Sequence, residues 1–464
     1  MFSPSFINPI TTKLKPSKIQ SYDMADDVCD KCRPAFEKLE KEVAELRKYV
    51  QILEAHLARF MNPHTPPSLA RAYKKKEHKD DEISKGISGQ KPGHEGKTRK
   101  QPEPQRHITA LARQCTNCHA NLPEPKFFER RVIEEIPQPQ PILVTEFLLA
   151  HYECCNCGAK TIAAHPECPE DGMFGYNVLA LAALMKHKWR MPYRMACDAM
   201  NIMYDFTLSA ATALDINRRV SDALEPEYDQ IKENIRDADV VYGDETSAPM
   251  NGENYWDWSF STPTDVLFAI RDNRSSDVPK EILGNDFHGA MVNDGWKPYG
   301  EYAKEHGLQM GRCWSHILRE ADDLAEKMPA VQCVPDKLRK ILKYLKENVK
   351  QNPSKKERKR LYANGLRRLR QLTKKRFRKP KAKKFMEKLE RARPSLMTFV
   401  LVPGMEPTNN RSERNLREQV IQRKISRTFR SQKGIRINEI EMSVFATWQA
   451  RGWNCYTELL KRLT

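Results

Sequence analysis

The chain has 464 residues, of which 30% are charged and 8% aromatic, and its formal net charge is +18. This length exceeds that of one ordinary domain, and the excess of positive charge favours a polyanionic partner. No apolar run approaches the roughly 18 residues of a membrane span, and no signal peptide is evident, so we expect a soluble, cytoplasmic protein without a membrane partner, whose cysteines are thiols or zinc ligands rather than disulfides.

The N-terminal part combines a mobile segment, a heptad repeat and a linker. Residues 1–35 are expected to be mobile, and no role is assigned to Cys29 and Cys32 within them. Over residues 36–60 the apolar positions recur at alternating steps of three and four, which predicts a short parallel coiled coil; an amphipathic helix packed on its own chain is the alternative. Residues 61–110, rich in Pro, Gly, Lys and Glu, have the composition of a basic linker.

Two Cys-x-x-Cys motifs predict a zinc-binding β module over residues 111–168. Cys115 with Cys118, and Cys154 with Cys157, supply four thiolates, which is typical of a closed structural zinc site. The segment between the pairs is longer than usual, so a β-hairpin formed within residues 130–154 is expected to bring them together. Free cysteines are the alternative, and Cys155 competes with Cys154 as a ligand.

Residues 169–236 are rich in helical patterns and predict a DNA-binding helical domain. Two short helices precede a third that Thr207 or Ser209 would cap, an order that fits a helix-turn-helix. Its last helix is expected to end at Arg218 and Arg219. A plain helical connector explains the same pattern.

The remaining residues, 237–464, begin with strand-like runs and continue with helices. The five runs lie at residues 240–245, 254–262, 265–272, 289–294 and near 310–317. A helical, basic insertion is predicted at about 320–400, where residues 351–395 hold 19 Lys and Arg against 3 Glu, a balance of +16. Charge runs usually form solvated surfaces, but a surplus this concentrated indicates contact with phosphates.

Three carboxylates stand at positions where chemistry is expected. Asp244 and Asp294 each end a predicted strand, and Glu413 lies in the first turn of a C-terminal helix. Apolar residues on the same helix face would pack on the sheet and direct Glu413 towards the strand ends. These neighbours are Leu416 or Arg417, and Val420. Oxygen ligands of this kind suit Mg²⁺ or Mn²⁺, and phosphoryl transfer commonly uses two such ions.

Each carboxylate also has a structural explanation. Asn410 and Glu413 fit a capping box, and Asp294 begins an Asp-Gly turn dipeptide. Asp244 could pair with an arginine. Glu245 points to the opposite side of its strand by alternation and is at best a supporting residue.

Four stretches, "YGDET", "VNDGWKPYG", "GRCWSHILRE" and "TNNRSERNLR", resemble in order the motifs of transposases of the insertion sequence 66 family. The zipper-like start, "GQKPGHEGK", the paired CxxC motifs and "MPYRMACDAM" follow the order of the same family. The resemblance covers roughly residues 36–464. The departures are Asn293 before the second aspartate and a lysine-rich insertion before the glutamate.

The resemblance implies a multidomain α+β protein whose residues 237–464 form a ribonuclease-H-like core with a DDE triad of Asp244, Asp294 and Glu413. It implies Mg²⁺ or Mn²⁺ at the triad and Zn²⁺ at the four cysteines. The implied activity is cleavage at transposon inverted-repeat ends and transfer of the freed 3′-hydroxyl into target DNA. The implied assembly is a homodimer or higher oligomer, with accessory proteins of the same element. A non-catalytic, zinc-containing DNA-binding regulator is the alternative.

Overall fold

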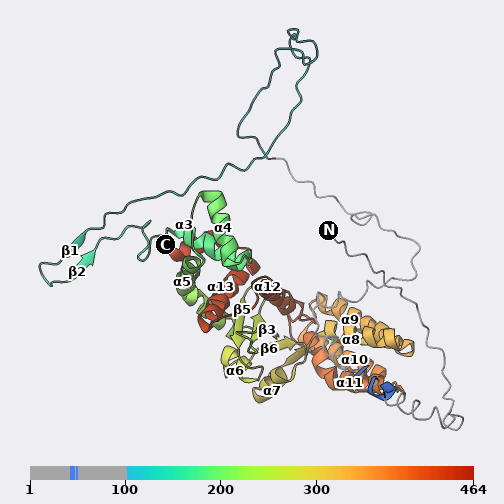
Figure 1. The fold of residues 1–464 in the computed structure, drawn as a ribbon. Coiled ribbons are helices and arrows are strands. Elements are labelled where there is room, and N and C mark those ends of the chain that lie inside the picture. The colour runs from blue at the N-terminus through green and yellow to red at the C-terminus, as the bar shows by residue number, and fades with distance from the viewer. Residues whose placement is uncertain (1–41, 47–48, 51–101) are drawn as a thin grey trace, which may run out of the picture. The chain divides into compact units, whose positions relative to one another are not determined.

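The computed structural model describes residues 42–46, 49–50 and 102–464, which fall into two units, residues 1–107 and 108–464 (Figure 1). In the first unit, residues 42–46 and 49–50 are helical, and Val43, Leu46 and Val50 are exposed. These three occupy seam positions of the predicted coiled coil. Its other residues, the predicted mobile segment 1–35 and the linker up to residue 101 lie outside the described part of the chain.

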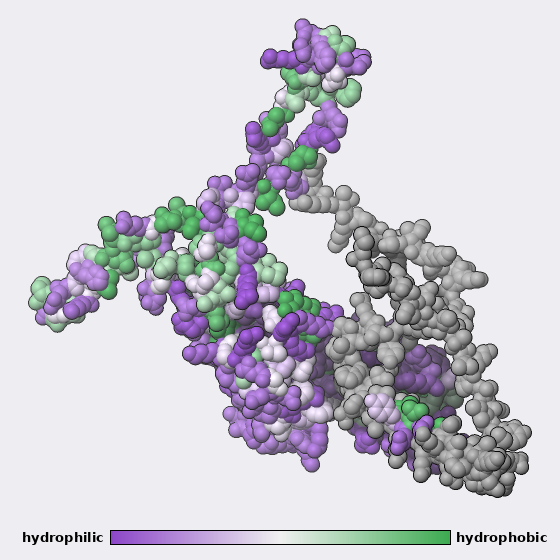
Figure 2. Space-filling model, in the orientation of Figure 1, coloured by the Kyte–Doolittle hydropathy of each residue, from purple (hydrophilic) through white to green (hydrophobic). Residues whose placement is uncertain are grey.

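The second unit begins with a segment that has little regular structure. Its short strands β1 (His151–Glu153) and β2 (Lys160–Ile162) pair antiparallel around the second CxxC motif. The predicted hairpin within residues 130–154 is wrong, because the strand before Cys154 pairs with residues that follow it. Prolines at 137, 139 and 141 lack the N–H groups that a strand needs. Apolar side chains of this segment are exposed and are visible as green atoms in Figure 2.

A helical layer follows the segment. It consists of α3 (Tyr176–Ala183), a π-helical turn (Leu184–Lys188), α4 (Tyr193–Tyr204) and α5 (Ala210–Arg236). Ser209 caps α5 by accepting the Thr212 N–H at 3.0 Å, which confirms one of the two predicted caps. The predicted end of this helix at Arg218 and Arg219 is wrong, because a buried apolar face continues to Ile235 and keeps the helix packed along its length.

A five-stranded mixed sheet forms the centre of the unit, in the order β5-β4-β3-β6-β7. The strands are β3 (Val240–Ser247), β4 (Trp256–Ser261), β5 (Val266–Arg271), β6 (Ala290–Asn293) and β7 (Met310–Arg312). β3, β4 and β5 pair antiparallel, whereas β6 pairs parallel with β3, and β7 parallel with β6. The five predicted strands are confirmed.

Both faces of the sheet are covered, because successive side chains of β3 enter different cores. Val241 packs with residues of α5 and of the crossover helices α6 (Asp277–Leu283) and α7 (Lys297–Glu305). Val240 and Tyr242 pack with the helices that follow β7. The C-terminal helices α12 (Asn410–Ser426), α13 (Gln432–Ala450) and α14 (Cys455–Leu463) complete the unit. The fold is mixed α+β, as predicted.

The predicted helical insertion is confirmed between β7 and α12. It contains α8 (Trp314–Lys327), a 3₁₀ turn (Pro329–Val331), α9 (Cys333–Lys350), α10 (Lys355–Thr373) and α11 (Pro380–Leu401), which gather beside the sheet in Figure 1. Its two ends meet, since the Trp314 N–H donates to the Pro407 carbonyl at 3.0 Å. Most of its lysines and arginines are exposed. None of the helices in the described residues is long and apolar enough to span a membrane.

Candidate active site at the ends of strands β3 and β6

The parallel pairing of β3 and β6 brings two of the predicted carboxylates together. Tyr242 pairs with Val292 at the end of the ladder. Asp244 lies two residues further along β3, and Asp294 follows β6 directly, so both carboxylates lie at the same edge of the sheet, where the charge of Asp294 raises the pKa of Asp244. Asp294 also forms the predicted turn, because its Oδ1 accepts the Trp296 N–H at 2.8 Å and the following Gly295 has φ +90°. The turn explanation and the site therefore coexist at this residue.

Glu413 reaches the same edge because the first turn of α12 is attached to β3. The Asn409 side-chain amide donates to the Gly243 carbonyl at 2.8 Å, and the Ser412 hydroxyl donates to the Tyr242 carbonyl at 2.7 Å. The helix therefore starts directly beside the two peptide groups that precede Asp244. Its buried face is more polar than predicted. That face consists of Ser412, Leu416, Gln419 and Gln422, while Val420 is only partly buried.

The capping-box explanation of Glu413 is wrong. The N-cap residue of α12 is Asn409, and no side-chain hydrogen bond caps the helix. The Asn410 side chain instead accepts a hydrogen bond from the Ser315 hydroxyl at 3.2 Å. The carboxylate of Glu413 is thus left to interact with other groups at the strand ends.

Electrostatics ties the carboxylates into one group. Burial raises the pKa of Asp244 well above its ordinary value, and the neighbouring charges of Glu245, Asp294 and Glu413 raise it further. Among the described residues, no lysine or arginine lies within ion-pair distance of Asp244, so the proposed pairing with an arginine is not observed. A cluster of carboxylates that disfavour one another's charge is the environment that a divalent cation would neutralise.

Glu245 differs from its neighbour in having a cationic partner. Its side chain is 1% exposed and forms an ion pair with Arg274, whose Nε lies 3.0 Å from Oε1. The Arg274 guanidinium lies over the rings of Trp256 at 4.5 Å and Trp296 at 3.9 Å. Glu245 is therefore joined through Arg274 to the loop that follows Asp294, and its supporting role stays a prediction. The prediction did not identify Arg274 as its partner.

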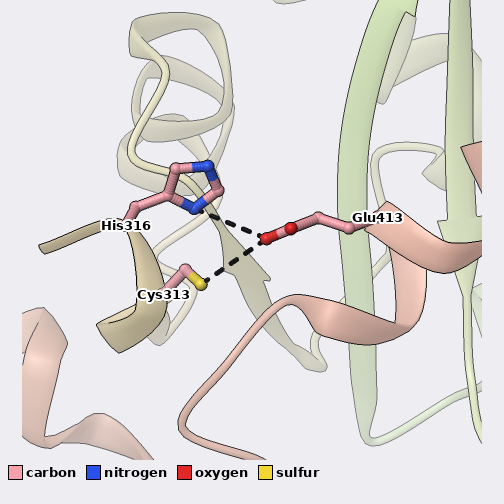
Figure 3. Close-up of side chains that lie close together, drawn as sticks. All are labelled: Cys313, His316 and Glu413. Atoms are coloured by element: carbon pink, nitrogen blue, oxygen red, sulfur yellow. Dashed lines mark hydrogen bonds and ion pairs between the residues drawn. The ribbon is translucent and has the colours of Figure 1, made fainter. Parts of the chain in front are cut away.

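Cys313 and His316 contact the carboxylate of Glu413, and neither residue was predicted to do so. Cys313 follows β7 directly and is the N-cap residue of α8, and His316 lies in the first turn of that helix. Figure 3 shows both side chains turned towards Glu413: the Oε1 atom lies 3.6 Å from Nδ1 of His316 and 4.0 Å from Sγ of Cys313. A Cys-x-x-His spacing at a strand-to-helix junction was the available signal, within "GRCWSHILRE".

The two CxxC motifs fold as similar turns. Cys115 and Cys154 each donate their N–H to the carbonyl of the residue five positions on, at 2.8 and 2.9 Å, and each accepts at its own carbonyl the N–H four positions on. Backbone N–H groups of Cys118 and Asn117 lower the pKa of Cys115, and those of Asn156 and Cys157 lower the pKa of Cys154. The four sulfur atoms, all within the described residues, do not gather at one point. Zinc binding there stays a prediction.

These features define a mixed α+β protein with an acidic centre at the edge of its sheet and a basic helical insertion next to it. The model of the IS66 transposase family matches residues 171–437, more than half of the chain, and the chain belongs to this family. This confirms the resemblance drawn from the sequence motifs. A curated protein of Sinorhizobium fredii, named uncharacterized protein y4jD, is 24% identical over 212 residues, which are 40% of this chain and 41% of that protein. The chain thus spans about two-fifths of that relative's length.

Proposed function

We propose that this chain is a DDE transposase that cuts DNA at the ends of its own element and joins the freed 3′-hydroxyl to target DNA. The observation that carries the proposal is that Asp294, after a strand end, and Glu413, at a helix start, lie near enough to Asp244 to raise its pKa. Among the described residues the three carboxylates do not form one close cluster, because Glu413 groups with Cys313 and His316. Family membership supports a transposase role. The order of the sheet, three antiparallel strands followed by two parallel ones, supports a ribonuclease-H-like core for residues 237–464.

The residues at this edge fit divalent cations such as Mg²⁺ or Mn²⁺. All three proposed ligands offer carboxylate oxygens. Burial raises the pKa of Asp244 most, and the negative charges of its neighbours raise it further. When bound, the cations supply activation of the attacking oxygen and stabilisation of the leaving oxygen. In this proposal Asp244 and Asp294 bind them and Glu413 completes the set. The Glu245–Arg274 pair holds the loop after β6 in place.

The rest of the chain would hold the DNA. The exposed lysines and arginines of α10 and α11 suit contacts with phosphates. We assign recognition of the inverted-repeat ends to the zinc module of residues 111–168 and to the helical layer of residues 169–236. Exposed seam residues such as Leu46 suit pairing of two subunits through residues 36–60, which would hold both ends in one complex.

Nicking of a plasmid that carries the ends of the element tests the proposal. The ends are identified from the DNA that flanks the gene, as inverted repeats bracketed by a short direct duplication. We expect Mg²⁺-dependent nicking by the wild type and by Asp239→Asn, an exposed aspartate before β3, and loss of nicking in Asp244→Asn, Asp294→Asn and Glu413→Gln. Full nicking by a folded Asp244→Asn protein would refute the triad.

Two neighbouring functions give different results in the same assay. A simple metal-dependent nuclease would nick the ends but would not join them to a second plasmid. A non-catalytic regulator would bind the ends without nicking them under any metal. Family membership does not favour the regulator.

A further inference from the structure

We propose that Cys313, His316 and Glu413 form a Zn²⁺ site, and that Zn²⁺ bound there withdraws Glu413 from the proposed Mg²⁺ site. Zinc would then act as an inhibitor of the reaction. The binding of zinc rests on the three side chains alone, whereas the inhibition rests on the proposed function.

The distances between the ligand atoms suit a tetrahedral ion. Sγ of Cys313, one ring nitrogen of His316 and one carboxylate oxygen of Glu413 all lie within 4.8 Å of one another. Glu413 Oε1 lies 4.0 Å from Sγ and 3.6 Å from Nδ1. Tetrahedral zinc with ordinary bond lengths needs ligand atoms about 3.3–3.6 Å apart. Small side-chain rotations close this difference.

Each of the three ligands stands on backbone that is already held in place. Cys313 and His316 are three residues apart at the start of α8, so they share one face of the helix. The Asn409 N–H, next to the first turn of α12, donates to Sγ of Cys313 at 3.2 Å, so the backbone that positions Glu413 also contacts the sulfur. Cys313 is fully buried. N–H donors of this kind support a metal-bound thiolate and fix its direction.

The donor set distinguishes this site from the neighbouring carboxylates. Thiolate and imidazole ligands favour Zn²⁺, whereas Mg²⁺ requires oxygen ligands in an octahedral arrangement. Glu413 is the single residue that belongs to both sets, and its carboxylate already faces Cys313 and His316 in Figure 3. A carboxylate held by zinc on this side is not available to the ions held by Asp244 and Asp294. The two metals therefore compete through one side chain.

Zinc content measures the binding directly. The full chain is stripped of metal, reloaded with Zn²⁺ and analysed for bound zinc, with Cys313→Ala and His316→Ala compared with wild type. Cys333→Ala is the matched control, because Cys333 is a partly buried cysteine at the start of another helix, α9. We expect Cys313→Ala and His316→Ala to bind one zinc fewer than wild type and Cys333→Ala. Any zinc held by the CxxC motifs is common to all four proteins.

Equal zinc content in all four proteins would overturn the site. His316→Gln provides a further folded variant if Cys313→Ala unfolds, because His316 is 19% exposed and its replacement disturbs the core less. Circular dichroism establishes the fold of each variant.

Inhibition is measured separately, as Mg²⁺-dependent nicking with increasing Zn²⁺, relative to the zinc-free rate of each protein. We expect the half-inhibitory zinc concentration to rise by about ten-fold or more in Cys313→Ala and His316→Ala, and to stay unchanged in Cys333→Ala. Equal inhibition of all proteins would overturn the competition for Glu413. Absence of nicking in every protein would contradict the proposed function, while the zinc content would still decide the site.

Discussion

Replacement of Asp244 by asparagine should stabilise the metal-free protein, even though it should abolish nicking. Burial disfavours the charge of Asp244, and the nearby charges of Glu245, Asp294 and Glu413 disfavour it further. A unit charge about 6–8 Å away contributes about 2–3 kcal/mol at an effective dielectric constant of about 20. The repulsion from Asp294 and Glu413 is removed, while the new amide loses about 1 kcal/mol if it is incompletely hydrogen-bonded. We therefore expect the free energy of unfolding to rise by about 1–3 kcal/mol at about pH 8 without metal.

The gain should depend on pH with a definite sign. Because the pKa of Asp244 in the folded protein lies above its ordinary value of 3.8, the folded state holds this proton more tightly than the unfolded state. The free energy of unfolding of the wild type therefore falls as the pH rises from the ordinary pKa through the raised one. Asparagine does not titrate, so this contribution to the fall disappears and the gain of the variant shrinks towards low pH.

Urea unfolding followed by tryptophan fluorescence measures this effect. All seven tryptophans lie between residues 189 and 453, so the signal reports the second unit alone. Asp239→Asn is the control, and saturating Mg²⁺ should stabilise the wild type by about 2.7 kcal/mol at 100 times its dissociation constant but leave Asp244→Asn nearly unaffected. An Asp244→Asn protein that is less stable than wild type in metal-free buffer at high pH would show that the carboxylates do not repel one another as inferred.

Three further changes test other parts of the structure by urea unfolding or DNA binding. Ser412→Ala removes the hydroxyl that joins α12 to β3, and should lower the free energy of unfolding by about 1–3 kcal/mol. It should also lower the nicking rate, because the first turn of α12 positions Glu413. Unchanged nicking would show that this hydrogen bond does not position Glu413. Glu441→Gln should raise the free energy of unfolding by about 1 kcal/mol or more at about pH 8, and by less at about pH 5. Burial raises the pKa of Glu441 well above 4.5, so the stability of the wild type falls as the pH rises past that value. A gain independent of pH would contradict this cause. Replacement of three exposed lysines of α11 by alanine should make the affinity for DNA depend less steeply on salt concentration. In a plot of log affinity against log salt, the magnitude of the slope should fall by up to about 0.9 for each phosphate that is no longer neutralised. An unchanged slope would show that DNA does not contact these lysines. These lysines are Lys381, Lys383 and Lys384.

The strands and the carboxylates at their ends were predictable because each leaves a local signal. β3 and β6 are short apolar runs that stop at an acid, and parallel strands place such stops at one edge. The prediction placed helix α12 against the sheet through an apolar face. In the structure this face is small, and side-chain hydrogen bonds of Asn409 and Ser412 attach the helix to β3. Polar anchors of this kind have no periodicity in the sequence.

Other features depend on contacts between distant residues and could not be read locally. Helix α5 continues past Arg219 because it packs along α13, and the residues near Arg219 give no local signal of this packing. The approach of Cys313 and His316 to Glu413 joins residues that are about one hundred positions apart, on either side of the insertion. At the two CxxC motifs, the spacing of the cysteines predicted one shared zinc site. The described residues instead form two separate turns, and their four sulfur atoms do not meet.

The closure of the insertion at its base has a consequence for how this family can vary. The chain leaves the sheet at Trp314 and returns at Pro407, and a backbone hydrogen bond joins the two points. The helices near this closure also pack on β3 and β6, so that they share one core with the sheet, whereas the loop between α9 and α10 lies outside any strand pairing. We therefore expect changes of length to be tolerated in the connections between these helices, and not in the helices that cover the sheet.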